Sequence, residues 1–178
     1  MRIFVRIFRN ILFRILKKDM NEVRISDYRN SGMRIGGGCR IFTKINTSEP
    51  YLIEIGNNVT ISTNVELVTH DNSAIKIYDD ATDFVGKIQI GNNCFIGTRA
   101  IILPGVSIAD NVIVGAGSVV TKSICKEGVV VAGNPAKEIN TIENIAEKNY
   151  LYRFNFRQIN CEDKKFIIEN NREKWLER

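Results

Sequence analysis

Histidine is almost absent from this sequence, which has a single one, His70, among 178 residues. The chain therefore cannot supply three imidazoles to a histidine-based zinc site. Its four cysteines lie 55, 31 and 36 residues apart, without the close pairs of a zinc site or the spacing of a disulfide framework. We expect Cys39 and Cys94 to be buried, reduced thiols, as in a cytoplasmic protein, and we expect no bound metal.

Long apolar runs are absent from residues 1–18, where at most three apolar residues follow one another before Arg or Asn intervenes. This excludes the core of a signal peptide and a membrane span there. The segment has six Arg and Lys and no acidic residue, so with a chain total of +5 the other 160 residues sum to −1. A basic surface spread over the fold, as nucleic-acid binding needs, is thus lacking. We expect a basic amphipathic helix that either associates weakly with the inner membrane surface or packs on the end of the fold.

A six-residue repeat is the main positive feature of the chain and is clearest in residues 88–125. Each repeat starts with an aliphatic residue, its second residue is often Gly or Ala, and its fifth is small to medium in size. The first positions are Ile90, Ile96, Ile102, Ile108, Val114 and Val120. This period fits neither an α-helix nor a plain alternating strand. It predicts a solenoid of short strands and tight turns, in which each repeat stacks on the next.

The repeat also predicts which residues point inward. The fifth residue of one repeat and the first of the next are two apart, so on a strand both face the same way. Gly or Ala at the second position is expected to permit the corner, and three repeats are expected to close one triangular coil. Sixth positions then face outward, and several are apolar, including Phe95, Ile101 and Ile113. Exposed apolar faces favour an interface between copies of the chain.

Breaks in the repeat divide the chain into three parts. Residues 1–29 form the basic helix and a lead-in, 30–140 the solenoid, and 141–178 an extension whose apolar spacing predicts one or two helices. The phase slips by two residues around 48–50, and the period is interrupted at about 73–87, where we expect a loop excursion. Aromatic residues of the extension either pack or stack on a sugar; they are Tyr150, Tyr152, Phe154, Phe156 and Trp175.

The stretches Val-Gly-Ala-Gly-Ser-Val-Val-Thr-Lys-Ser-Ile at 114–124 and Val-Val-Val-Ala-Gly-Asn-Pro-Ala-Lys at 129–137 carry a resemblance. Together with the repeat they resemble the hexapeptide-repeat acyltransferases, in particular the branch that O-acetylates sugars and polysaccharides. The resemblance covers about residues 30–140. It implies a mainly β fold, a left-handed parallel β-helix, acetyl-coenzyme A as co-substrate, and a homotrimer with active sites between subunits.

His70 is the residue expected to be catalytic. It stands where the repeat gives way to the excursion, and residues 68–72 resemble the family's catalytic-histidine segment. Imidazole, with an ordinary pKa near ~6.5, suits removal of a hydroxyl proton near neutral pH. A base needs an orienting partner, for which Asp71, Asn64 and Glu66 remain open, each with a substrate contact as the alternative. The resemblance favours the substrate role for Asn64.

Cofactor contacts follow from the resemblance, matched by motif. Gly115 and Gly117 leave the backbone unshielded for a pantetheine arm, and Lys122 and Lys137 offer cations for phosphates. Alternatively, the glycines serve only tight corners and Lys122 is a solvated surface residue. The expected contacts are Phe95, Thr98, Ala116, Thr121, Lys122 and Lys137.

These features predict an acetyl-coenzyme A-dependent O-acetyltransferase that acts on a sugar hydroxyl by direct transfer, in surface polysaccharide assembly. N-acetylation of an amino sugar or nucleotide sugar is one alternative, and a non-catalytic trimeric scaffold is another. A serine acetyltransferase is not expected, because the large N-terminal helical domain of those enzymes is not found here. The carbonic anhydrases of this fold use three histidines, which excludes them.

Overall fold

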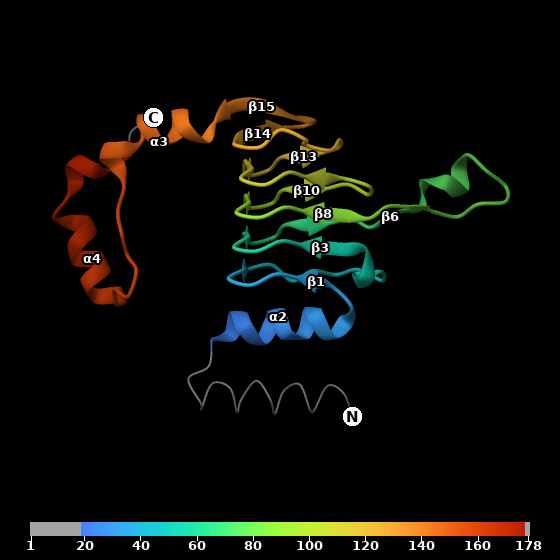
Figure 1. Cartoon of the computed structure of the whole chain (residues 1–178), viewed down its shortest axis with the longest axis horizontal. Helices are drawn as coiled ribbons and strands as arrows, with labels where there is room; N and C mark the ends of the chain where they lie inside the picture. Colours follow the sequence, from blue (N-terminus) through green and yellow to red (C-terminus); the bar gives the residue numbers. More distant parts are fainter. Residues whose placement is uncertain (1–18, 177–178) are drawn as a thin grey trace. The chain divides into compact units, whose positions relative to one another are not determined.

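The computed structural model describes residues 19–176, so the helix expected over residues 1–18 lies outside the described part. Short strands wind into stacked coils that form three sheets (Figure 1). Sheet A contains β1 (Arg34–Ile35), β3 (Ile53–Ile55), β8 (Ile88–Ile90) and β11 (Ser107–Ile108). Sheet B contains β2 (Arg40–Ile41), β4 (Thr60–Ile61), β9 (Phe95–Ile96), β12 (Ile113–Val114), β14 (Val129–Gly133) and β15 (Ala136–Thr141). Sheet C contains β5 (Glu66–Leu67), β10 (Ile101–Ile102) and β13 (Val119–Val120).

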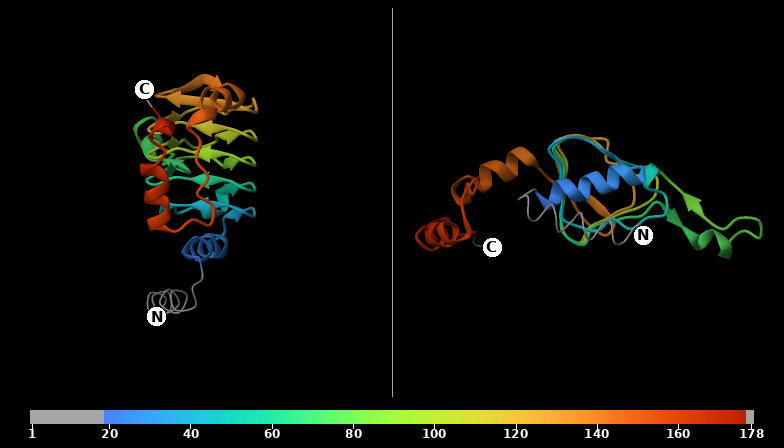
Figure 2. Two further views of the ribbon diagram at one scale, coloured as in Figure 1. Left: turned by 90° about the vertical axis from the view of Figure 1, so that its left-hand side faces the viewer. Right: turned by 90° about the horizontal axis from the view of Figure 1, so that it is seen from below.

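Pairing between coils is parallel and follows the expected repeat. Ile101 pairs with Val119, 18 residues later, which is three hexads. The earlier coils are longer: Arg40 pairs with Thr60, 20 residues later, and Glu66 pairs with Ile101, 35 residues later. The first difference is the two-residue slip at 48–50, and the second is the excursion. Viewed along the stack, the coils superpose in a triangular outline (Figure 2, right).

The first and fifth positions of the hexads form the core, as the repeat predicts. Ile61, Ile96 and Ile102 have no exposed surface, and the thiols of Cys39 and Cys94 are 2% exposed. Each of these two thiols donates to a carbonyl oxygen of the next coil, 3.1 Å away in both cases. The interior is therefore one continuous apolar column with internally satisfied thiols.

Glycines at the second position of the repeat do not make the corners, which was their expected role. A Cβ on Gly91 would lie 2.8 Å from the carbonyl carbon of Ala109 in the next coil, too close for any side chain. Positive φ angles occur instead at the fourth position, for example Asn93 at 55° and Gly117 at 69°. Glycine at the second position thus allows close stacking of coils, and Asn or Gly at the fourth makes the turn.

Helix α2 (Met20–Ser31) covers the first coil, beneath β1 in Figure 1. It begins at the N-cap Asp19 and ends at Gly32, with φ 113°. Its polar side chains bond the open backbone edge of that coil: Asn21 contacts Cys39 and Ile41, Arg24 contacts Ile41, Tyr28 contacts Thr43 and Ile45, and Arg29 contacts Ile35 and Gly36. Unpaired strand groups at a solenoid end are thereby satisfied. This helix corrects the expectation of a mere lead-in between residue 18 and the solenoid.

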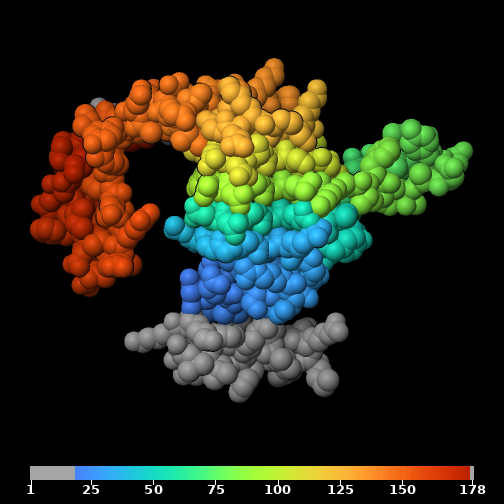
Figure 3. Space-filling model, in the orientation of Figure 1, coloured from blue at the N-terminus to red at the C-terminus, as the bar shows by residue number. Residues whose placement is uncertain are grey.

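An arm projects from the stack between sheets C and A, to the right in Figures 1 and 3. Its base is an antiparallel pair in which β6 (His70–Asp71) faces β7 (Phe84–Val85). The 3₁₀ turn η2 (Asn72–Lys76) follows, with the Asp71 carboxylate accepting from the backbone N–H of Ser73. The excursion therefore begins at His70 itself.

Residues 140–176 form a second compact unit. Its helices are α3 (Ile142–Lys148) and α4 (Cys161–Glu169), capped by Thr141 and Asn160, with the short turns η3 (Tyr150–Tyr152) and η4 (Arg172–Lys174). The rings of Phe154 and Phe156 stack 5.3 Å apart. Within residues 19–176, no helix has the length and apolar character to cross a bilayer.

Candidate active site

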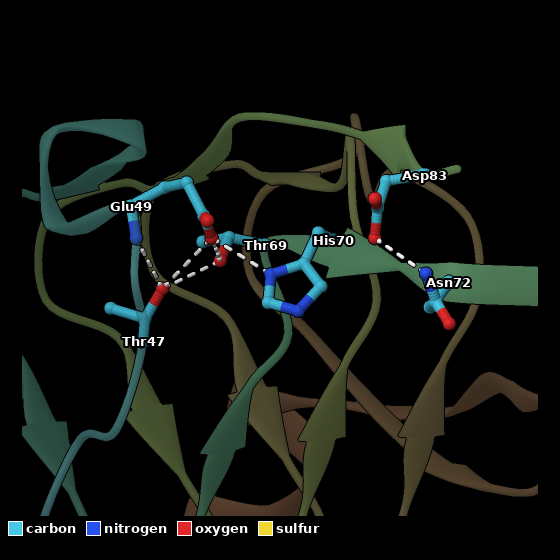
Figure 4. Close-up of polar contacts among 6 residues, drawn as sticks. All are labelled: Thr47, Glu49, Thr69, His70, Asn72 and Asp83. Atoms are coloured by element: carbon cyan, nitrogen blue, oxygen red, sulfur yellow. Dashed lines mark hydrogen bonds and ion pairs between the residues drawn. The ribbon is translucent and has the colours of Figure 1, made fainter. Parts of the chain in front are cut away.

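His70 lies at the base of the arm. It comes three residues after β5, where the second coil of the stack ends. Its Nδ1 is 2.8 Å from Oε2 of Glu49, which belongs to the preceding coil (Figure 4). An ionised carboxylate only accepts hydrogen bonds, so Nδ1 carries the hydrogen and Nε2 keeps its lone pair. The contact fixes both the orientation and the tautomer of the imidazole.

Glu49 is itself held by a closed chain of hydrogen bonds. Its backbone N–H donates to Thr47 Oγ1 (3.0 Å), the hydroxyls of Thr47 and Thr69 are 2.6 Å apart, and Thr69 donates to Glu49 Oε2 (2.8 Å). The Thr47 hydroxyl also lies 3.4 Å from Glu49 Oε2, so its single hydrogen can be donated to Thr69 or to the carboxylate. Thr69 is 2% exposed, so water does not compete with it.

The two partners shift each other's pKa in opposite directions. The hydrogen bond to Glu49, and then its negative charge, raise the pKa of His70 above its ordinary 6.5. The bond from His70, and then that from Thr69, lower the pKa of Glu49 below 4.5. The carboxylate therefore stays ionised near neutral pH and makes the imidazole a stronger base. The side chain of His70 is 41% exposed, and within residues 19–176 no hydrogen bond occupies its other nitrogen.

None of the three expected orienters makes this contact. The carboxylate of Asp71 caps η2 instead, and that hydrogen bond to Ser73 lowers its pKa. Glu66 is exposed on β5, and Asn64 occupies a fourth-position corner with φ 56°. The sequence contained one signal for Glu49: it stands in the phase slip at 48–50, one coil before His70.

A cavity of about 810 Å³ lies on sheet C beside His70. It includes Asn64 and Glu66, which the sequence reading connected with the site, together with Lys44 and Arg99, which it did not. Thr47 and Thr69 of the hydrogen-bond chain also line it. The cavity thus joins a base to several hydroxyl, amide and charged groups, which suits a polyhydroxylated ligand.

The expected cofactor residues separate into two groups on either side of sheet C. Thr98 and Ala116 are exposed on the corner between sheets B and C, stacked so that the Gly117 N–H donates to the Thr98 carbonyl (2.8 Å). Thr121 and Lys122 follow β13, on the corner between sheets C and A. The list of expected contacts is completed by Phe95, 43% exposed on β9, and Lys137 on β15. His70 leaves the coil at the corner of Thr121 and Lys122.

No other group in the site is arranged as a nucleophile. Cys94 lies inside the coil, and burial raises the pKa of its thiol, which keeps it protonated. Within residues 19–176, no three His, Cys, Asp or Glu side chains gather as metal ligands. The candidate site is an imidazole hydrogen-bonded to a carboxylate beside an open cavity.

Comparisons with known proteins place this chain in a family. Residues 87–122 match the model described as "Hexapeptide repeat of succinyl-transferase". The chain is 40% identical to Protein CapG of Staphylococcus aureus over 168 residues, which cover 91% of this chain and 95% of that protein. It is 37% identical over 129 residues to the galactoside O-acetyltransferase of Escherichia coli K12, covering 71% of this chain and 63% of that one.

A solved structure gives the same answer for the fold. A hexapeptide-repeat acetyltransferase from Vibrio cholerae, crystallised with acetyl-coenzyme A, superposes with a TM-score of 0.55 and 26% identity over 62% of this chain and 60% of that one. The coils, the repeat and these relatives define an acyltransferase of the hexapeptide-repeat class. The chain belongs to the hexapeptide-repeat acyltransferase family, and CapG is a relative over nearly its whole length.

Proposed function

We propose that this protein is an acetyl-coenzyme A-dependent sugar O-acetyltransferase that works in surface polysaccharide assembly. The observation that carries the proposal is the His70–Glu49 pair, which leaves Nε2 as a free base beside a polar cavity. A galactoside O-acetyltransferase among the relatives supports the sugar hydroxyl as acceptor, and the acetyl-coenzyme A complex of the structural neighbour supports the donor. The family resemblance further implies that the coils wind left-handed.

His70 acts as general base in the proposed transfer. Nε2 takes the proton of the acceptor hydroxyl while that oxygen forms a bond to the thioester carbonyl carbon. Glu49 stabilises the resulting imidazolium through Nδ1. When the carbon–sulfur bond breaks, the imidazolium returns its proton to the leaving thiolate, which restores His70. Removing such a base lowers rates by about 10²–10⁴-fold.

The separation of the cofactor residues supports an active site shared between two chains. Thr98 and His70 lie on opposite corners of sheet C, about six residues of extended chain apart, or roughly 20 Å. A pantetheine arm lying along the Thr98–Ala116 corner would not reach His70 of the same chain. Outward-facing Ile101 and Val119 give sheet C an apolar surface, partly exposed, that a neighbouring copy can cover. We include a trimer with its sites between subunits in the proposal.

Mixing two inactive variants tests that arrangement. His70→Ala removes the base, and Ala116→Trp fills the corner where the arm is expected to lie. If sites form between chains, each mixed trimer holds one site with both parts intact, so mixed assembly restores part of the activity. Absence of restoration in demonstrably mixed trimers would overturn the shared site and leave the acetyltransferase proposal standing.

The activity is tested by mass spectrometry of sugars incubated with acetyl-coenzyme A and the full-length protein. An O-acetyl ester, removed by mild alkali, is expected on a neutral or charged hexose. An alkali-stable acetamide formed only on amino sugars would replace the proposal by N-acetylation. No binding of coenzyme A at all would favour a scaffold.

A further inference from the structure

Three side chains form a ladder along the corner between sheets B and C. Lys44, Asn64 and Arg99 each lie four residues after the first residue of β2, β4 or β9, and those strands are paired in register. The Arg99 N–H donates to the Thr63 carbonyl, so the corners of Asn64 and Arg99 stack on each other. Neighbouring strands lie about 4.8 Å apart, so Lys44 and Arg99 are about 10 Å apart at the backbone. All three line the same cavity as His70, on the opposite corner of sheet C.

The side chains of the ladder form no hydrogen bonds with one another, unlike those at the equivalent positions on the neighbouring corner. Between sheets A and B, Asn58 donates to Asn93 at 2.9 Å, so that ladder is held by its own side chains. Across residues 19–176, no hydrogen bond or ion pair joins the side chains of Lys44, Asn64 or Arg99 to other residues. Two cations and an amide therefore face the cavity with their donors free for a ligand.

Arg99 also has a backbone conformation that arginine rarely adopts. Its φ is 59°, in the left-handed region, where the other described fourth positions with positive φ are Asn or Gly. Asn and Gly adopt this region readily, whereas a long side chain is strained there. Strain of this kind persists mostly at functional sites. The coil needs a turn at this position, and nothing in the turn needs a guanidinium.

We propose that the Lys44–Asn64–Arg99 ladder binds an anionic group, a carboxylate or a phosphate, that the sugar acceptor carries across sheet C from the hydroxyl presented to His70. This inference rests on the proposed function and adds the class of sugar. Arg99 provides a planar fork for paired oxygens, and Lys44 a second charge two coils away. Glu66, the acidic residue in the cavity, accepts hydroxyl hydrogens of the sugar. Both cations of the cavity lining, Lys44 and Arg99, belong to the ladder, whereas the ionised Glu49 lies beside His70.

The phosphates of coenzyme A are a second source of anionic oxygens, because Thr98 precedes Arg99. The direction in which the ladder runs favours the acceptor, and not coenzyme A, as the source of the bound anion. From Arg99 it runs back through Asn64 to Lys44, toward α2, whereas the expected cofactor track runs the other way, from Thr98 to Ala116. The anion bound by Lys44 therefore lies away from the cofactor.

Equilibrium binding to the full-length protein tests the ladder without depending on turnover. Galactose, galacturonic acid and galactose 1-phosphate are titrated at constant ionic strength into wild type, Lys44→Gln, Arg99→Asn and the double variant. Arg40→Gln is the matched control, because Arg40 is an exposed cation on β2 outside the cavity. We expect at least one anionic sugar to bind wild type about tenfold or more tightly than galactose. The ladder variants should lose that preference, and the control should keep it.

Stability and cofactor binding complete the test. Arg99→Asn should melt at the same temperature as wild type or higher, since Asn suits the left-handed turn. Its affinity for coenzyme A should be unchanged. The inference is overturned if neutral and anionic sugars bind equally, if no anionic sugar binds at millimolar concentration, or if the variants keep the preference. Weaker coenzyme A binding in the ladder variants would assign the anion to the cofactor and also overturn it. Acetylation of galactose alone would leave the proposed function intact.

Discussion

Replacing Glu49 by Gln tests how the carboxylate acts on the base. The amide is nearly the same size, and its oxygen can still accept the Nδ1–H of His70, but the negative charge 2.8 Å from the ring is lost. That charge and its hydrogen bond are what raise the pKa of His70. Complete removal of a general base costs about 10²–10⁴-fold. Both side chains are partly exposed, at 41% and 20%, so solvent screens the charge and we expect a fall in kcat of about 10²-fold, at the lower end.

The pH dependence of the activity shows in which direction the pKa of His70 changes. The base must be neutral, so activity in the wild type rises with pH through a His70 pKa above 6.5. In Glu49→Gln that pKa falls, and the acid limb of kcat/KM moves to lower pH. Steady-state rates between pH 5 and 9 measure it, with the KM for acetyl-coenzyme A expected to stay constant.

Glu54→Gln is the matched control, because Glu54 is a paired carboxylate on sheet A that bonds Lys87 and Arg34 away from the site. Its acid limb should coincide with that of wild type. An unchanged limb in Glu49→Gln, or an equal shift in Glu54→Gln, would refute the assignment of Glu49 as the orienting residue.

Two further predictions follow from the hydrogen-bond chain and the coil stacking. Thr69→Val should lower kcat by about tenfold, because Glu49 loses a buried donor that holds it against His70, whereas Thr69→Ser should retain the rate; the steady-state rates of the two variants decide it. Gly91→Ala should lower the free energy of unfolding by about 1–3 kcal/mol, because its Cβ meets the next coil at 2.8 Å. Gly37→Ala, whose Cβ has no neighbour nearer than 3.9 Å, should change it little in the same denaturant titration.

The solenoid was predictable because its repeat acts one coil at a time. Ile96 and Cys94 are two residues apart on a short strand, so their inward direction follows from local geometry alone. Helix α2 escaped prediction because it binds the first coil mainly through polar side chains such as Asn21 and Tyr28. An apolar period could not reveal such a helix.

The site was predictable only in part, because some of its residues meet only when successive coils stack. His70 was identifiable as the single imidazole at the end of a repeat. Its partner Glu49 is 21 residues earlier, and only the register of the slipped coil, 20 residues long, shows that the two lie side by side. Arg99 could not be connected with the site from the sequence for the same reason: its left-handed backbone, and its lack of side-chain partners among residues 19–176, appear only in three dimensions.

The most direct test of the central claim compares wild type with His70→Ala. Release of coenzyme A from acetyl-coenzyme A is followed with a pooled set of sugar acceptors, and coenzyme A binding is measured in parallel to show that the variant is folded. The account predicts an acceptor-dependent rate that falls by about 10²-fold or more in the variant while the affinity for coenzyme A is retained. Equal rates in the two proteins would contradict it and remove His70 from the mechanism.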